Sequence, residues 1–152
     1  MTEKPIIEPQ AYGPDCSAAV KEFLIARVTP FRHDIVLLKE IPVQSEFSID
    51  LMFDQVEKIA ESMGPFYALV DLTEAQRPPA RMREYLRKRL GRLTSLKYVA
   101  LFTGKNFVLN MAAQFVFGTT TFSSFSVHKT QEEALLAIEK AQSAEKESSR
   151  IR

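Results

Sequence analysis

Apolar and polar residues follow one another along this chain in blocks that predict strands and helices in turn. The blocks at 66–72 (FYALVDL) and 98–102 (YVALF) are almost wholly apolar. Such runs are typical of strands that are buried on both faces of a parallel sheet. Two earlier blocks, at 23–28 and 34–41, are separated by a short polar gap that contains Pro30, which predicts an antiparallel hairpin with the first strand ending at the proline.

A last strand is predicted near residue 125, because residue types alternate there. Phe125 and Val127 face one side of this strand. The residues expected on its other side are Phe122, Ser124, Ser126 and His128.

Between the strands, apolar residues recur at steps of three and four, which predicts helices. The first stripe runs from Met52 to Met63, with Ser48 as its expected N-cap and Gly64 as its stop. Further stripes predict helices over 82–93 and 107–117. A capping box at 130–133 (TQEE) starts a final helix.

The predicted order is therefore ββαβαβαβα, an α/β fold with a five-stranded, mixed but mostly parallel sheet and four helices. We expect residues 1–20 to be an irregular lead-in that contains three prolines. Residues 21–142 would form one domain, and residues 143–152 a polar tail that frays.

Composition narrows the class of protein. The chain has 152 residues, a net charge of +1 and a single cysteine. That length suits one domain with a sizeable core, and one cysteine excludes an internal disulfide or a multi-cysteine metal site. Neither a signal peptide nor a transmembrane run is evident, so we expect a cytoplasmic protein. The chain carries no overall basic charge, which argues against a nucleic-acid-binding protein.

Three motifs carry a resemblance to a known fold: FYALVDLTEA at 66–75, YVALFTGKNF at 98–107, and FSVHKTQEEALLAIEKA at 125–141. Over roughly residues 24–142 the chain resembles the STAS fold of anti-sigma-factor antagonists, and most of all the broader SpoIIAA-like (STAS/SEC14-related) group. The resemblance implies a regulatory or scaffold domain that works by contact, or a member that binds an apolar ligand.

The chain departs from that group where its antagonists carry a phosphorylated serine. The corresponding segment, 74–81 (EAQRPPAR), has no hydroxyl residue, and Thr73 lies earlier, at the strand end. The phosphorylation switch is therefore not implied for this chain.

Residues with catalytic chemistry are few. His33 and His128 have no partner at metal-ligand spacing, and Cys16 lies in the proline-rich lead-in. Asp71 and Glu74 lie at a strand terminus, where α/β folds place ligands, but Asp71 is also a typical turn residue that bonds loop amides. We expect a non-enzymatic protein without a cofactor or metal. An enzyme using Asp71 or His128 is the minor alternative.

The helix predicted over 82–93 is strongly basic on its outer faces, with Glu84 as its one acidic residue. Its charges are either balanced across space by the acidic segment 46–61, or they form a docking surface for an acidic protein partner or an anionic membrane surface. The predicted docking residues are Arg81, Arg83, Arg87, Lys88 and Arg92.

The segment 107–117 is apolar on more than one face, which is unusual for a helix that covers one side of a sheet. Three interpretations of this segment are open. Neighbouring elements or the lead-in cover its apolar surface, or the segment forms a homo-oligomer or partner interface, or it lines an apolar pocket. The predicted interface residues are Phe107, Leu109, Met111, Phe115 and Phe117. The predicted residues of the pocket are Phe107, Met111, Phe115 and Phe122.

Two functions follow as expectations. The first is a regulatory or scaffold module that acts through protein–protein contacts and self-associates. The alternative is a carrier or sensor of a lipid-like small molecule.

Overall fold

The computed structural model describes residues 12–105 and 124–151, and within them the predicted fold class is confirmed. The elements are α1 (Ala18–Ala26), β1 (Val28–Arg32), β2 (Ile35–Lys39), α2 (Glu46–Ala60), β3 (Phe66–Asp71), α3 (Ala80–Gly91), β4 (Leu96–Phe102), β5 (Phe125–His128) and α5 (Gln131–Ile151). The five strands form one mixed sheet in the order β1-β2-β3-β4-β5, in which only the β1–β2 pair is antiparallel. The helix predicted over 107–117 lies outside the described residues.

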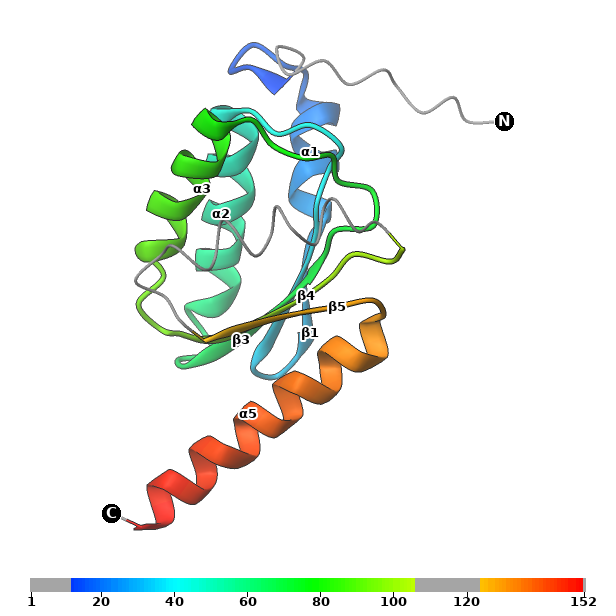
Figure 1. The fold of residues 1–152 in the computed structure, drawn as a ribbon. Coiled ribbons are helices and arrows are strands. Elements are labelled where there is room, and N and C mark those ends of the chain that lie inside the picture. Colours follow the sequence, from blue (N-terminus) through cyan, green and yellow to red (C-terminus); the bar gives the residue numbers. More distant parts are fainter. Residues whose placement is uncertain (1–11, 106–123, 152) are drawn as a thin grey trace.

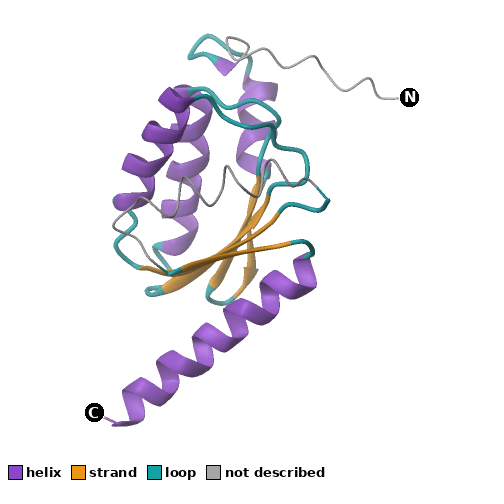
Figure 2. Ribbon diagram, in the orientation of Figure 1, coloured by secondary structure: helices purple, strands orange, loops and turns teal. Residues whose placement is uncertain are grey.

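The sheet separates two layers of helices (Figure 1). The parallel strands follow one another in order across the sheet, and right-handed crossovers between such strands all lie on the same face. Accordingly α2 and α3 cover one face, together with α1, whereas α5 follows the last strand and covers the other (Figure 2).

Side chains alternate between the two layers along each central strand. On the α2–α3 face, the buried side chains of the strands belong to one core. They include Val36, Leu38, Val99 and Leu101. On the α5 face, Ala134 and Ile138 pack against a second set of strand residues. That set includes Ile35, Tyr67, Leu69, Ala100 and Phe102. Burial on both faces is the reason that these strands read as continuous apolar runs.

The prediction of a strand over 23–28 was wrong, because residues 18–26 form a helix. Ser17 caps it by accepting a hydrogen bond from the Val20 amide at 3.2 Å. Val20 and Leu24, four residues apart, both pack into the core, while Phe23 faces outward. The helix begins inside the segment that was predicted to be an irregular lead-in.

Pro30 does not end the first strand but lies within it. The Lys39 amide donates to the Arg27 carbonyl oxygen at 2.9 Å, so alternate residues from Arg27 onward face β2, and the nitrogen of Pro30 faces away from it. Because β1 is an edge strand, no ladder hydrogen bond is lost there.

The predicted cap of α2 was also displaced. Ser45, not Ser48, is the N-cap, and the two serines form a capping box in which each side chain accepts from the amide of the other. Half of the predicted box at the start of α5 is present, since Thr130 Oγ1 accepts from the Glu133 amide at 3.2 Å. The Glu133 carboxylate accepts from the amide of Lys129, one residue before the position that the box requires. The helix that follows continues to Ile151, through most of the predicted tail, and extends past the sheet (Figure 1).

Candidate ligand-binding pocket

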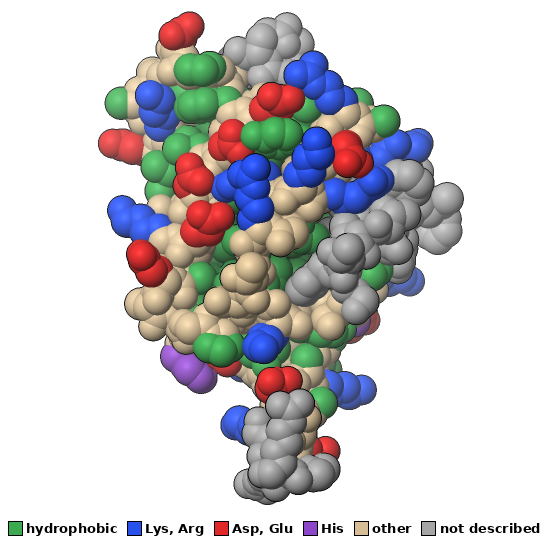
Figure 3. Space-filling model, turned by 90° about the vertical axis from the view of Figure 1, so that its left-hand side faces the viewer, with side chains coloured by type: hydrophobic (Ala, Val, Ile, Leu, Met, Phe, Trp, Pro, Cys, Tyr) green, Lys and Arg blue, Asp and Glu red, His purple; other side chains and the backbone are tan. Residues whose placement is uncertain are grey.

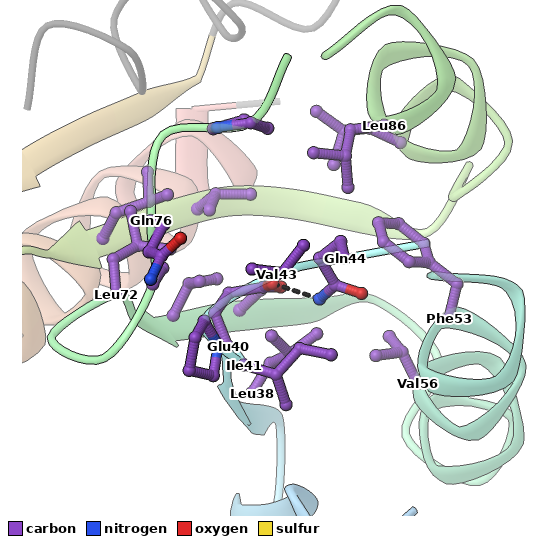
Figure 4. Close-up of a pocket in the computed structure, with 18 of the residues that line it drawn as sticks. Leu38, Glu40, Ile41, Val43, Gln44, Phe53, Val56, Leu72, Gln76 and Leu86 are labelled. Carbon is purple, nitrogen blue, oxygen red and sulfur yellow. Dashed lines mark hydrogen bonds between the residues drawn. The ribbon is translucent and has the colours of Figure 1, made fainter. Parts of the chain in front are cut away.

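A cavity of about 330 Å³ lies between the sheet and the helices α2 and α3 (Figure 4). This volume is at the lower end of the range of small-molecule sites. Phe53 and Val56 of α2 and Leu86 and Leu90 of α3 form its walls. Its floor consists of the inward side chains of three strands. These are Val36, Leu38, Ala68, Val70, Val99 and Leu101.

A short side chain in the floor accounts for part of this space. The sheet register places Ala68 between Val36 and Val99, so the three side chains form one row across β2, β3 and β4. The next row, two residues along each strand, is filled by the larger Leu38, Val70 and Leu101. The floor is therefore lower at Ala68 than on either side of it.

Two loops close the end of the cavity at the carboxyl ends of the strands. One follows β2 and contributes the segment 40–44, and the other follows β3 and contributes the segment 75–79. The backbone amide of Gln76 donates to the carbonyl oxygen of Pro42 at 2.9 Å, and this hydrogen bond joins the two loops.

Glu40 and Gln44 introduce polarity into this otherwise apolar lining. The Gln44 side-chain amide donates to the Glu40 carboxyl group (Figure 4), and its own carbonyl oxygen accepts from Ser48 Oγ at 2.6 Å. Burial raises the pKa of Glu40 to about 7, against the lowering effects of the Gln44 hydrogen bond and of the Arg27 charge. Glu40 is thus only partly ionised near neutral pH.

Arg27, just after α1, fastens the strand end that carries Glu40. Its Nε donates to the Lys39 carbonyl oxygen at 3.0 Å and its Nη2 to that of Glu40 at 2.9 Å. The same Nη2 forms a 2.7 Å ion pair with Glu74, in the loop after β3. The sequence analysis missed Arg27, whose partners lie up to 47 residues away.

The basic helix is partly neutralised by α2, as the first of the two alternatives predicts. Arg81 forms an ion pair with Glu46 at 2.9 Å. Arg89, which was not among the predicted docking residues, is 7% exposed and its Nη2 lies 3.0 Å from a carboxylate oxygen of Asp54. Side chains of both signs are interspersed over this side of the molecule (Figure 3).

The other predicted docking residues differ in their surroundings. Arg87 forms an ion pair with Glu84 at 2.7 Å, and Arg83 donates to the Pro78 carbonyl oxygen at 2.9 Å. Lys88 and Arg92 are exposed. The predicted apolar interface and pocket residues lie outside the described residues. These are Phe107, Leu109, Met111, Phe115, Phe117 and Phe122.

The candidate catalytic side chains are engaged locally. Asp71 accepts from the amide and the hydroxyl of Thr73, at 2.9 and 2.6 Å, which is the predicted turn role. His128 lies 2.6 Å from Ser126 Oγ, and burial lowers the pKa of this histidine. His33 lies 3.7 Å from the carboxylate of Asp34.

Comparison with known proteins assigns no family. No family model, curated protein or solved structure matches this chain. Within residues 12–105 and 124–151, no helix is long and apolar enough to cross a membrane. The same residues contain no cluster of three or more side chains suited to holding a metal ion.

Proposed function

We propose that this chain binds a small apolar molecule in the cavity between the sheet and the α2–α3 pair, and that it acts as a carrier or sensor without catalysing a reaction. The observation that carries the proposal is the cavity itself, which is large enough for a small ligand and lined mainly by hydrocarbon.

The engagement of Asp71 and Glu74 supports a binding role over an enzymatic one that would use these two residues. Asp71 is bound within its own turn and Glu74 is paired with Arg27, so neither carboxylate is directed at the cavity as a free acid or base. A general acid or base must reach the reacting atom of a bound substrate. The STAS-like function through protein–protein contacts stays a prediction, because its predicted apolar interface falls on residues 107–117, outside the described residues.

Fluorescence of N-phenyl-1-naphthylamine, an uncharged apolar probe, tests the proposal. We expect saturable enhancement with a stoichiometry near one, and a rise in melting temperature that grows with probe concentration, because a ligand that binds only the folded state stabilises it. Native mass spectrometry of freshly purified protein would identify a ligand that copurifies.

Ala68→Leu is the matched blocking variant, because it fills the low point of the floor. The control is Ala26→Leu, which adds the same atoms to an exposed position of α1. We expect the first change to weaken probe binding at least tenfold and the second to leave it unchanged. Equal binding by both variants, or no saturable binding by the parent protein, would contradict the proposal.

A further inference from the structure

The polar residues of the cavity are gathered at one end, and their arrangement bears on the chemistry of the ligand. Glu40, Gln44 and Gln76 all belong to the two loops at the carboxyl end of the strands (Figure 4). The walls and floor away from this end are hydrocarbon. A molecule that fills the cavity would therefore find hydrogen-bonding partners at one end only.

The hydrogen-bonding capacity at that end is only partly used by the described residues. Gln44 is engaged on both sides, since its carbonyl oxygen accepts from Ser48 and its side-chain amide donates to Glu40 and to Met52 Sδ. Glu40 bonds Gln44 through Oε2, which leaves Oε1 without a hydrogen-bond partner in the described part of the chain. The Gln76 side chain is exposed to solvent and accepts or donates no hydrogen bond to another residue among 12–105 and 124–151.

We infer that the ligand is amphipathic, with an uncharged hydrogen-bond-accepting head, such as a ketone or ester carbonyl, that lies against Glu40 and Gln76 while its hydrocarbon body fills the space above Ala68. This inference rests on the proposed function. It concerns the class of ligand and not whether the cavity is occupied.

The surrounding charges favour a neutral head over a carboxylate. Arg27 is a half-buried cation that holds the strand end carrying Glu40, but its guanidinium is committed to two carbonyl oxygens and to Glu74. Arg77, on the rim, is exposed, so its attraction for an anion is screened by solvent. A ligand carboxylate would also lie against Glu40, which carries negative charge once it ionises. Neither of the other charged residues at these strand ends changes this preference, because Lys39 is exposed to solvent and Asp71 is hydrogen-bonded within its own turn.

Protonation of Glu40 completes the head-group site. A protonated carboxyl group can donate to a carbonyl oxygen, whereas an ionised one can only accept. Because burial raises the pKa of Glu40 to about 7, the donor is present at pH 6 and largely lost at pH 8. Binding of a carbonyl-headed ligand should weaken over that interval.

Displacement of N-phenyl-1-naphthylamine by 2-undecanone, undecane and undecanoate, at pH 6 and pH 8, tests the inference. We expect the ketone to compete about threefold to tenfold better than the alkane at pH 6, because one hydrogen bond contributes about that factor. Most of this advantage should be lost at pH 8, where the Gln76 side-chain amide is the remaining donor. Undecanoate, ionised at both values, should compete less well than the ketone at pH 6.

Two variants make the result specific to the head-group site. Glu40→Gln keeps a donor at every pH, so it should retain ketone binding and abolish its pH dependence. Glu40→Leu should reduce the preference for the ketone over the alkane at pH 6 to the level that the parent protein shows at pH 8. Persistent pH dependence in Glu40→Gln, or stronger binding of undecanoate than of the ketone at both pH values, would overturn the inference while the proposed function stands. Failure of the probe itself to bind would overturn the proposed function instead.

Discussion

Arg89 connects α3 to α2 from a buried position, and its removal tests how the two helices over the cavity are held together. Its guanidinium lies 3.0 Å from Asp54, 3.4 Å from Asp50 and 3.8 Å from Glu57, and it also stacks over the ring of Phe53 at 5.4 Å. Arg89 is 7% exposed, whereas the side chains of its acidic partners are between 46% and 67% exposed.

We expect Arg89→Ala to lower the free energy of unfolding by about 2 to 3 kcal/mol. A hydrogen bond to a charged group contributes about 1.5 to 3 kcal/mol, and the buried stem of the arginine adds packing against Phe53. The loss should stay below the 3 to 5 kcal/mol typical of a fully buried pair, because the three carboxylates regain solvent when the arginine is removed.

Urea unfolding followed by circular dichroism measures the loss. The control is Arg81→Ala, which removes a basic residue from the same helix face but breaks an exposed pair with Glu46, and should cost less than about 1 kcal/mol. A double-mutant cycle with Asp54→Ala isolates the pair itself, with a coupling energy near 1 kcal/mol expected. Equal losses in the two arginine variants would refute the buried-anchor reasoning, since only exposure distinguishes their pairs.

Three further predictions concern stability. The raised pKa of Glu40 contributes stability that is fully present below about pH 4.5 and is lost as pH rises through about 7. Glu40→Gln should remove this contribution to the decline, at most about 3 kcal/mol, in urea titrations from pH 4 to 8. Ser45→Ala removes half of the capping box of α2 and should cost about 1 kcal/mol by the same assay, whereas a loss near zero would exclude Ser45 as the cap. Leu24→Ala should cost about 2 to 5 kcal/mol because Leu24 is fully buried, and a loss no larger than that of Phe23→Ala would argue against docking of α1.

Periodicity was sufficient to predict the central part of the fold. The runs 66–72 and 98–102 are apolar on both faces except at Asp71, where β3 ends, so their assignment as buried parallel strands required no knowledge of their neighbours. The stripe that contains Met52 and Val56 likewise identified α2 by its spacing alone.

The start of the domain was mispredicted because two signals competed there. Phe23, Ile25 and Val28 favour a strand by residue type, whereas Val20 and Leu24 favour a helix by spacing. Packing decided for the helix: Leu24 is buried in the core beside Val28, which begins β1. The serine cap at Ser17 was a local signal that supported the same outcome.

The cavity could not be predicted from the sequence, because it depends on register. Ala68 leaves space only because Val36 and Val99, some thirty residues away on either side, are its neighbours in the sheet. Pattern reasoning assigns a residue to a face of a strand but not to a row across strands. The polar end depends in the same way on the hydrogen bond that joins Gln76 to Pro42.

The pairing of α2 with α3 did have a signal in the sequence, and it changes how the basic helix is understood. Three contacts between the helices join residues that are 35 positions apart: Glu46 with Arg81, Asp50 with Tyr85, and Asp54 with Arg89. Each member is four residues from the next, so the contacts form a ladder between two parallel helices.

A constant offset is the arrangement that successive right-handed crossovers produce, because both helices then run in the same direction over the sheet. The ladder lies along the edge of the helix pair, where its carboxylates remain partly solvated, while Phe53 and Leu86 turn toward the cavity beneath. Arg81, which was a predicted docking residue, and Arg89 thus help to fix the register of the two helices that enclose the cavity. Among the predicted docking residues that the structure describes, Lys88 and Arg92 are the exposed cations that lie off this ladder, and a docking surface on α3 would have to be centred on them.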